Sequence, residues 1–158
     1  MANTQSMCTS FLSELMTATH NFGTAPTRGS GAADTFKAAL YLASATYDAS
    51  TTAYSASGEV SGTGYTAGGV TVTNATPPAN TNTSATAGVG YWTPSASIVY
   101  TGVTLTTAFD AMLMYNSTQS DKAVAVFTFG SQTITSGNFT LTMPSNTTST
   151  ALLRLSTT

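Results

Sequence analysis

The chain has 158 residues and very few charges: four Lys or Arg and six Asp or Glu, which is 6% of the residues and a net charge of −2. An ordinary soluble domain has about a quarter of its residues charged. Four dispersed basic residues are too few to neutralise a run of phosphates, so the composition excludes a nucleic-acid-binding protein. It also gives no basis for binding to an anionic membrane surface, and no apolar run approaches the about 20 residues of a spanning helix.

The length predicts one domain with a single hydrophobic core. The first residues lack a basic stretch followed by an apolar one, so we expect synthesis in the cytosol. A single cysteine, Cys8, excludes an internal disulfide, and we interpret it as a small apolar residue that fills space on a helix. Stability must then come from packing or association.

Residues 4–20 contain the one convincing helical pattern. Its apolar residues recur at spacings of three and four and would form one stripe: Met7, Phe11, Leu12, Leu15 and Met16. Asn3 or Thr4 could cap the start, and Asn21-Phe22-Gly23 supplies a stop. Such a stripe must be buried, either against the chain's own sheet or against a neighbouring subunit. We therefore divide the chain into an N-terminal helix with its cap, 1–23, and a single β-sandwich domain, 24–158.

After a small-residue linker at 26–31 the pattern changes from helical to extended. We expect a strand at 35–43, a short edge strand at 53–54 and a strand at 70–73, which follows a glycine-rich segment at 58–69. Residues 74–87, with two adjacent prolines and repeated Asn and Thr, predict a polar loop.

Alternating apolar and polar residues dominate the second half of the chain. They predict strands at 97–105, 108–115, 123–129, 132–135, 138–143 and 151–155. Residues 116–121 and 136–137 have the composition of hairpin turns. The sequence therefore predicts a mainly β fold, an antiparallel β-sandwich of jelly-roll or Ig-like type, with one N-terminal α-helix.

Residues that could perform catalysis or bind a metal are scarce. The only histidine, His20, falls at the expected helix end, where we interpret it as a C-cap. No Gly-x-Ser-x-Gly motif supports a serine nucleophile, and Cys8 with His20 cannot complete a metal site. The pair Asp110 and Glu59 stays open as a glycosidase-like arrangement. We expect no enzyme activity, no cofactor and no metal.

The segment 62–69 superficially resembles a phosphate-binding loop, but it lacks the GxGxxG spacing and a following helix, so we expect a turn that enters the strand at Val70. Tyr65, Tyr91 and Trp92 could form a carbohydrate-stacking platform; the alternative for Trp92, beside Thr93-Pro94, is an anchor at a strand end.

Two stretches carry a family resemblance. Asp34-Thr35-Phe36-Lys37-Ala38-Ala39-Leu40-Tyr41 is followed by Glu59-Val60-Ser61-Gly62-Thr63-Gly64-Tyr65-Thr66-Ala67-Gly68-Gly69-Val70. Together they resemble small virion structural proteins of tailed bacteriophages, in which such a strand leads to an E-V-S-G-T-G-Y-x-x-G-G-V signature. Strands like 111–116, 126–130 and 137–142 follow it, so the similarity covers roughly 34–144.

The resemblance implies a structural role in a virion and brings no catalytic residues with it. We expect a capsid decoration or cement protein that docks on the major capsid protein or other virion proteins as a homo-oligomer, a trimer being one option. The alternative in a virion is a tail, adaptor or tail-fibre component that binds a receptor glycan; outside virions it is a carbohydrate-binding module or a small hydrolase. The predicted interface residues are the helix stripe Met7, Phe11, Leu12, Leu15 and Met16, with Tyr65, Tyr91 and Trp92.

Overall fold

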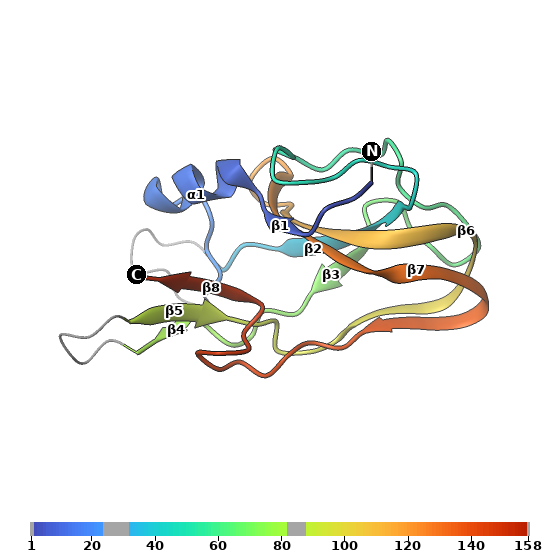
Figure 1. The fold of residues 1–158 in the computed structure, drawn as a ribbon. Helices are drawn as coiled ribbons and strands as arrows, with labels where there is room; N and C mark the ends of the chain where they lie inside the picture. Colours follow the sequence, from blue (N-terminus) through green and yellow to red (C-terminus); the bar gives the residue numbers. More distant parts are fainter. Residues whose placement is uncertain (1, 24–31, 82–87, 158) are drawn as a thin grey trace.

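The computed structural model describes residues 2–23, 32–81 and 88–157, and it contains two antiparallel sheets and one short helix (Figure 1). The larger sheet has the strand order β1-β7-β6-β2-β3, and the smaller has the order β4-β5-β8. The elements are β1 (Ser6–Met7), α1 (Thr9–Met16), β2 (Phe36–Leu42), β3 (Val70–Val72), β4 (Ala79–Asn80), β5 (Val89–Trp92), β6 (Ile98–Asn116), β7 (Lys122–Leu141) and β8 (Leu153–Ser156). The predicted mainly β, sandwich-like fold with one N-terminal helix is confirmed.

The long hairpin of β6 and β7 dominates this fold. The sequence predicted five separate strands here, but 19 residues of β6 and 20 of β7 run on without a break. The expected turn at 136–137 is wrong: the register between the two strands shifts at several points from Tyr100 to Ala111, so the hairpin bends there and curls from one layer into the other (Figure 1). The expected turn near 116–121 is confirmed, because β7 begins at Lys122.

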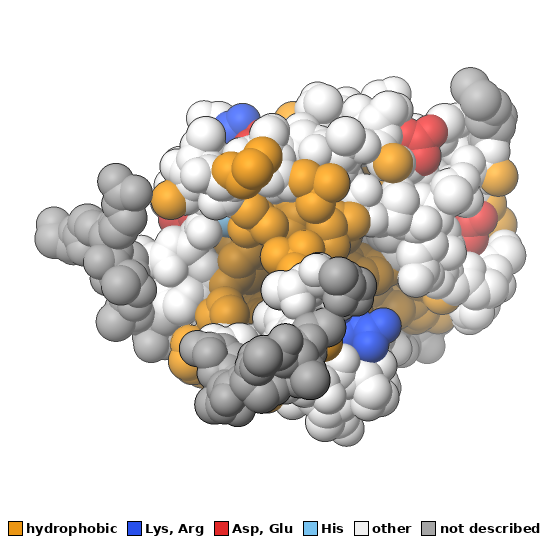
Figure 2. Space-filling view, turned by 60° about the vertical axis from the view of Figure 1, so that its left-hand side comes forward, with side chains coloured by type: hydrophobic (Ala, Val, Ile, Leu, Met, Phe, Trp, Pro, Cys, Tyr) orange, Lys and Arg blue, Asp and Glu red, His pale blue; other side chains and the backbone are white. Residues whose placement is uncertain are grey.

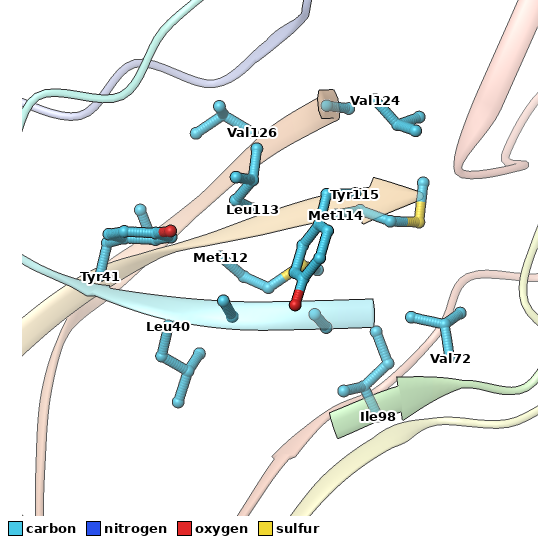
Figure 3. Packing of buried hydrophobic residues seen from close by; sticks show 14 of the residues in the cluster. Leu40, Tyr41, Val72, Ile98, Met112, Leu113, Met114, Tyr115, Val124 and Val126 are labelled. Carbon is cyan, nitrogen blue, oxygen red and sulfur yellow. The ribbon is translucent and has the colours of Figure 1, made fainter. Parts of the chain in front are cut away.

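The core lies on both faces of the larger sheet. Leu40 in β2 is paired with Met112 in β6, and they share one face, while Leu113 and Val126 share the other (Figure 3). Because β2 is flanked by β6 and β3 and is buried on both faces, apolar residues occupy both faces of the strand, with Lys37 as its one charged residue.

The N-terminal segment differs from the prediction. The helix spans only Thr9–Met16, because Ser6 and Met7 pair with β7 as a strand and Ala18 adopts a positive φ of 55° after the helix. The N-cap is Cys8, without a side-chain hydrogen bond, so the expected caps Asn3 and Thr4 are wrong.

Instead of capping the helix, Asn3 connects distant segments. Its Nδ2 donates to the Leu42 carbonyl at 3.1 Å and to Asp110 Oδ1 at 2.7 Å, and its Oδ1 accepts from the Tyr47 amide at 2.9 Å. These tertiary hydrogen bonds, together with the pairing of β1, outweigh the helical preference of the first residues.

Two short strands were missed by the sequence prediction. β4 lies inside the predicted loop 74–87 and β5 directly follows it, since neither is long enough to show a period. Part of that loop, 82–87, and the linker 26–31 lie outside the described residues. The strands predicted at 35–43, 70–73 and 151–155 are present within two residues of their expected bounds, and Ala53 forms only an isolated bridge with Lys122.

Candidate interaction surface

An apolar groove opens between the N-terminal segment and the smaller sheet, where Figure 2 shows hydrophobic side chains lining a hollow. Its volume is about 150 Å³. The residues that line it come from β1, α1, the segment after α1, and the strands β4, β5 and β8: Met7, Phe11, Leu15, Phe22, Pro78, Ala79, Gly90, Tyr91, Trp92, Leu153 and Leu155. None of them carries a charge, and we call this set the apolar groove.

Five of the eight predicted interface residues line the apolar groove: Met7, Phe11, Leu15, Tyr91 and Trp92. The helix stripe is therefore split. Phe11 is buried, whereas Leu12 and Met16 on the same helix are 47% and 84% exposed and are not part of the lining. Tyr65 lies elsewhere, in the loop after Glu59.

Sequence reasoning missed the lining residues that come from β4 and β8, because a short strand without a visible partner gives no sign of what it will face. Trp92 is buried at the end of β5, and its indole N–H donates to the Thr76 carbonyl at 3.0 Å. This placement agrees with the strand-end anchor that we weighed for Trp92.

A second cleft continues from the apolar groove and shares Met7 and Leu153 with it. It has a volume of about 290 Å³ and lies between β1, β7 and β8. Its one charged lining residue is Arg154, whose guanidinium donates to the carbonyls of Thr148 and Ser149 at 3.2 and 2.9 Å. Because these two backbone carbonyls already bind the guanidinium, the cleft offers mainly neutral contacts to a partner.

The signature segment 59–70 forms a loop that is held by the Glu59 carboxylate. Its Oε1 accepts hydrogen bonds from the Tyr65 hydroxyl at 2.7 Å and from the Gly68 amide at 2.8 Å, and its Oε2 accepts from the Tyr54 hydroxyl at 2.7 Å. Burial, followed by the hydrogen bond to Glu59, raises the pKa of Tyr54 to about 12 and raises that of Tyr65 further. Both hydroxyls therefore stay protonated donors at neutral pH, and the Glu59 carboxylate holds the loop through these hydrogen bonds.

The glycines of this loop allow backbone segments to approach closely. A Cβ at Gly62 would lie 2.0 Å from the Thr104 carbonyl oxygen, and one at Gly69 would lie 1.6 Å from that of Ala38. Gly69 also has a φ of +70°, which favours glycine. Packing of the loop over β2 and β6 therefore explains the glycines at these two positions, and the expected turn into the strand at Val70 is present.

A buried network of polar side chains fastens α1 to the larger sheet. His20 Nε2 lies 2.7 Å from Glu14 Oε2, and Lys122 Nζ lies 2.6 Å from Glu14 Oε1. Asn116 Nδ2 lies 3.1 Å from His20 Nδ1 and donates to Asp34 Oδ2 at 2.7 Å. The predicted C-cap role of His20 is wrong, because the helix ends at Met16 and the imidazole is used inside this network.

The electrostatics of this network favour an ionised Glu14. Burial alone would raise the pKa of its carboxyl, but hydrogen bonds and charge interactions with Lys122 and His20 act more strongly, and the pKa is lowered. The ionised carboxylate therefore contributes to the docking of α1.

The remaining candidate groups are engaged in separate structural contacts. Asp110 accepts from Asn3, whereas Glu59 accepts from Tyr54, Tyr65 and Gly68, so the two carboxylates share no hydrogen-bond partner. Burial raises the pKa of the Cys8 thiol to about 12, which suits the expected filler role.

Within the described ranges, no three His, Cys, Asp or Glu residues gather into a group that could hold a metal ion. Nor does any helix among those residues have the length and hydropathy needed to span a membrane.

Comparison of the chain with protein-family models, curated proteins and solved structures finds no match. The apolar groove is therefore the feature of this structure from which a function has to be argued.

Proposed function

We propose that this chain is a structural protein of a bacteriophage virion, most specifically a decoration or cement protein that docks on the capsid and stabilises the head. The observation that carries the proposal is the apolar groove, an open and uncharged concavity rimmed by the half-exposed Leu155. A groove of this kind suits burial against a protein surface. The resemblance of segments 34–41 and 59–70 to small virion proteins directs the proposal to a viral particle.

Docking through this groove would depend on apolar contact and shape instead of charge. The lining has no Asp, Glu, Lys, Arg or His side chain, and Arg154, the cation of the adjoining cleft, already donates to two backbone carbonyls. Salt screens interactions between charges and leaves apolar burial intact. We therefore expect the protein to stay bound to purified particles in molar NaCl, measured by pelleting the particles and quantifying the protein that remains; release into the supernatant contradicts the proposal.

A substitution at the rim tests the groove directly. Leu155→Asp places a charge where a partner would bury an apolar side chain, so we expect at least a tenfold loss of affinity for particles stripped of this protein. Val99→Asp is the matched control, since Val99 is 40% exposed, similar to 47% for Leu155, and lies outside the groove. Equal binding by the two variants would show that docking uses another surface.

The copy number and the position of the protein on the particle distinguish a role in the head from a role in the tail. An electron micrograph of particles labelled against this protein should show label over the whole head, with hundreds of copies per particle. Label confined to the tail, with a dozen copies or fewer, would replace the decoration role by a tail, adaptor or fibre role.

A further inference from the structure

The outer edge of β7 is open over most of its length. β1 pairs only with Ala125 and Val126, and among the described strands none pairs with 127–141 on that side. The corresponding side of β6 is covered, because the Thr104 amide donates to the Thr63 carbonyl of the signature loop at 2.9 Å. In Figure 1 this part of β7 runs around the end of the molecule opposite α1, whose residues Phe11 and Leu15 line the apolar groove.

This edge lacks most of the features that prevent an exposed edge strand from pairing with a strand of another chain. Natural edge strands are protected by Lys or other charges, by Pro, by bulges or by being short. The stretch 127–141 is long and contains no charged residue and no proline. It retains one protective feature, the irregular register with β6, which extends along β7 from Thr128 to Phe139.

The side chains along the edge also suit pairing with another strand. Thr133, Thr135 and Thr140 are exposed, and β-branched residues favour extended structure. Ile134 is half-buried and packs against the core, so it fixes which face of the strand points inward.

We propose that this edge binds a second copy of the same chain, through antiparallel pairing of β7 with β7 about a twofold axis. An antiparallel edge is complementary to itself, because each strand offers the N–H and C=O groups that the other requires. The uncharged edge gives no attraction to a partner of opposite charge, and a net charge of −2 per chain causes little repulsion between copies. The inference is independent of the proposed virion role, since it concerns a different surface and the isolated protein.

The first test measures the mass of the purified full-length chain in solution. We expect sedimentation equilibrium to give a mass about twice the monomer mass of 16.1 kDa. The double variant Thr133→Lys/Thr140→Lys adds edge lysines and should weaken association at least tenfold. The control Ser61→Lys/Thr66→Lys adds the same charge at exposed loop positions and should leave the dimer intact. A monomeric wild type, or equal weakening by both variants, overturns the proposal.

The second test detects the dimer directly by disulfide formation, without substitutions that are meant to weaken the pairing. Thr133→Cys, Thr135→Cys and Thr140→Cys are made separately, while the native Cys8 is fully buried and its raised pKa keeps it unreactive. In an antiparallel twofold pair only a residue close to the axis meets its own copy. Under mild oxidation we therefore expect one of the three variants to give a disulfide-linked dimer well above the others. Linking of none, or of all three equally, contradicts twofold pairing along this edge.

Discussion

At the scale of single residues, glycines and one carboxylate explain the most distinctive stretch of the sequence. Gly69 lies where the loop backbone meets the Ala38 carbonyl, and Glu59 accepts three hydrogen bonds from the loop and from Tyr54. From the sequence this stretch could be recognised as a turn, but not as a loop held by a carboxylate. The reason is that the partners of Glu59 depend on how the loop lies over β2.

Gly69→Ala tests the close approach. Its φ of +70° and the 1.6 Å separation of its Cβ from the Ala38 oxygen both oppose alanine, so we expect a loss of more than about 3 kcal/mol in the free energy of unfolding. Gly102→Ala is the control, because Gly102 has a φ of +63° but no atom within 4 Å of a Cβ, and it should lose only about 1 kcal/mol. Urea denaturation measures both; equal losses would mean that backbone conformation alone matters.

At the scale of elements, the sequence predicted strands well where they were long or buried and poorly where tertiary pairing decided the outcome. The strand predicted at 35–43 from the residues on its two faces is present as Phe36–Leu42. In contrast, Ser6–Met7 followed a helical pattern and became a strand, because β7 offered an edge. Of the residues that line the apolar groove, only some on β1, α1 and β5 were predicted as interface residues, since the pairing of β8 with β5 is a long-range contact that leaves no periodic signal.

The stability that the docking of α1 contributes should depend on pH. The pKa of Glu14 is lowered from its ordinary value of 4.5, so the ionised carboxylate stabilises the fold above that pH, and this contribution is lost as the pH falls from 4.5 through the lower pKa of the folded state. Glu14→Gln should cost about 2 kcal/mol at pH 7, because His20 and Lys122 lose a charged hydrogen-bond partner. Thermal denaturation should show that the difference in stability between the variant and the wild type becomes smaller below pH 4.5. A difference that is unchanged by pH would contradict this role for Glu14.

At the scale of the whole molecule, aromatic rings join the two sheets. Phe22 stacks on Phe36 of β2 with ring centroids 4.3 Å apart, and it also lies 4.8 Å from Trp92 of β5. The smaller sheet is thus packed against the N-terminal segment and the larger sheet, and β6 and β7 extend into both layers. We expect these parts to unfold as one unit.

Trp92 provides a local probe of that unit, because it is the only tryptophan in the chain. Its fluorescence reports on the smaller sheet, whereas far-ultraviolet circular dichroism reports on all strands. In urea the two signals should change with the same midpoint. A fluorescence transition at clearly lower urea would show that the smaller sheet opens independently.

The continuous hairpin of β6 and β7 has a consequence for the order of folding. Its strands are joined by the short turn at 117–121, so pairing can start beside Asn116 and Lys122 and extend outwards, each new pair closing only a small additional loop. When this extension passes the bend, the same strands enter the second layer. The hairpin can therefore reach both layers by local growth from one turn, and it then offers an edge to which the distant strand β2 can add.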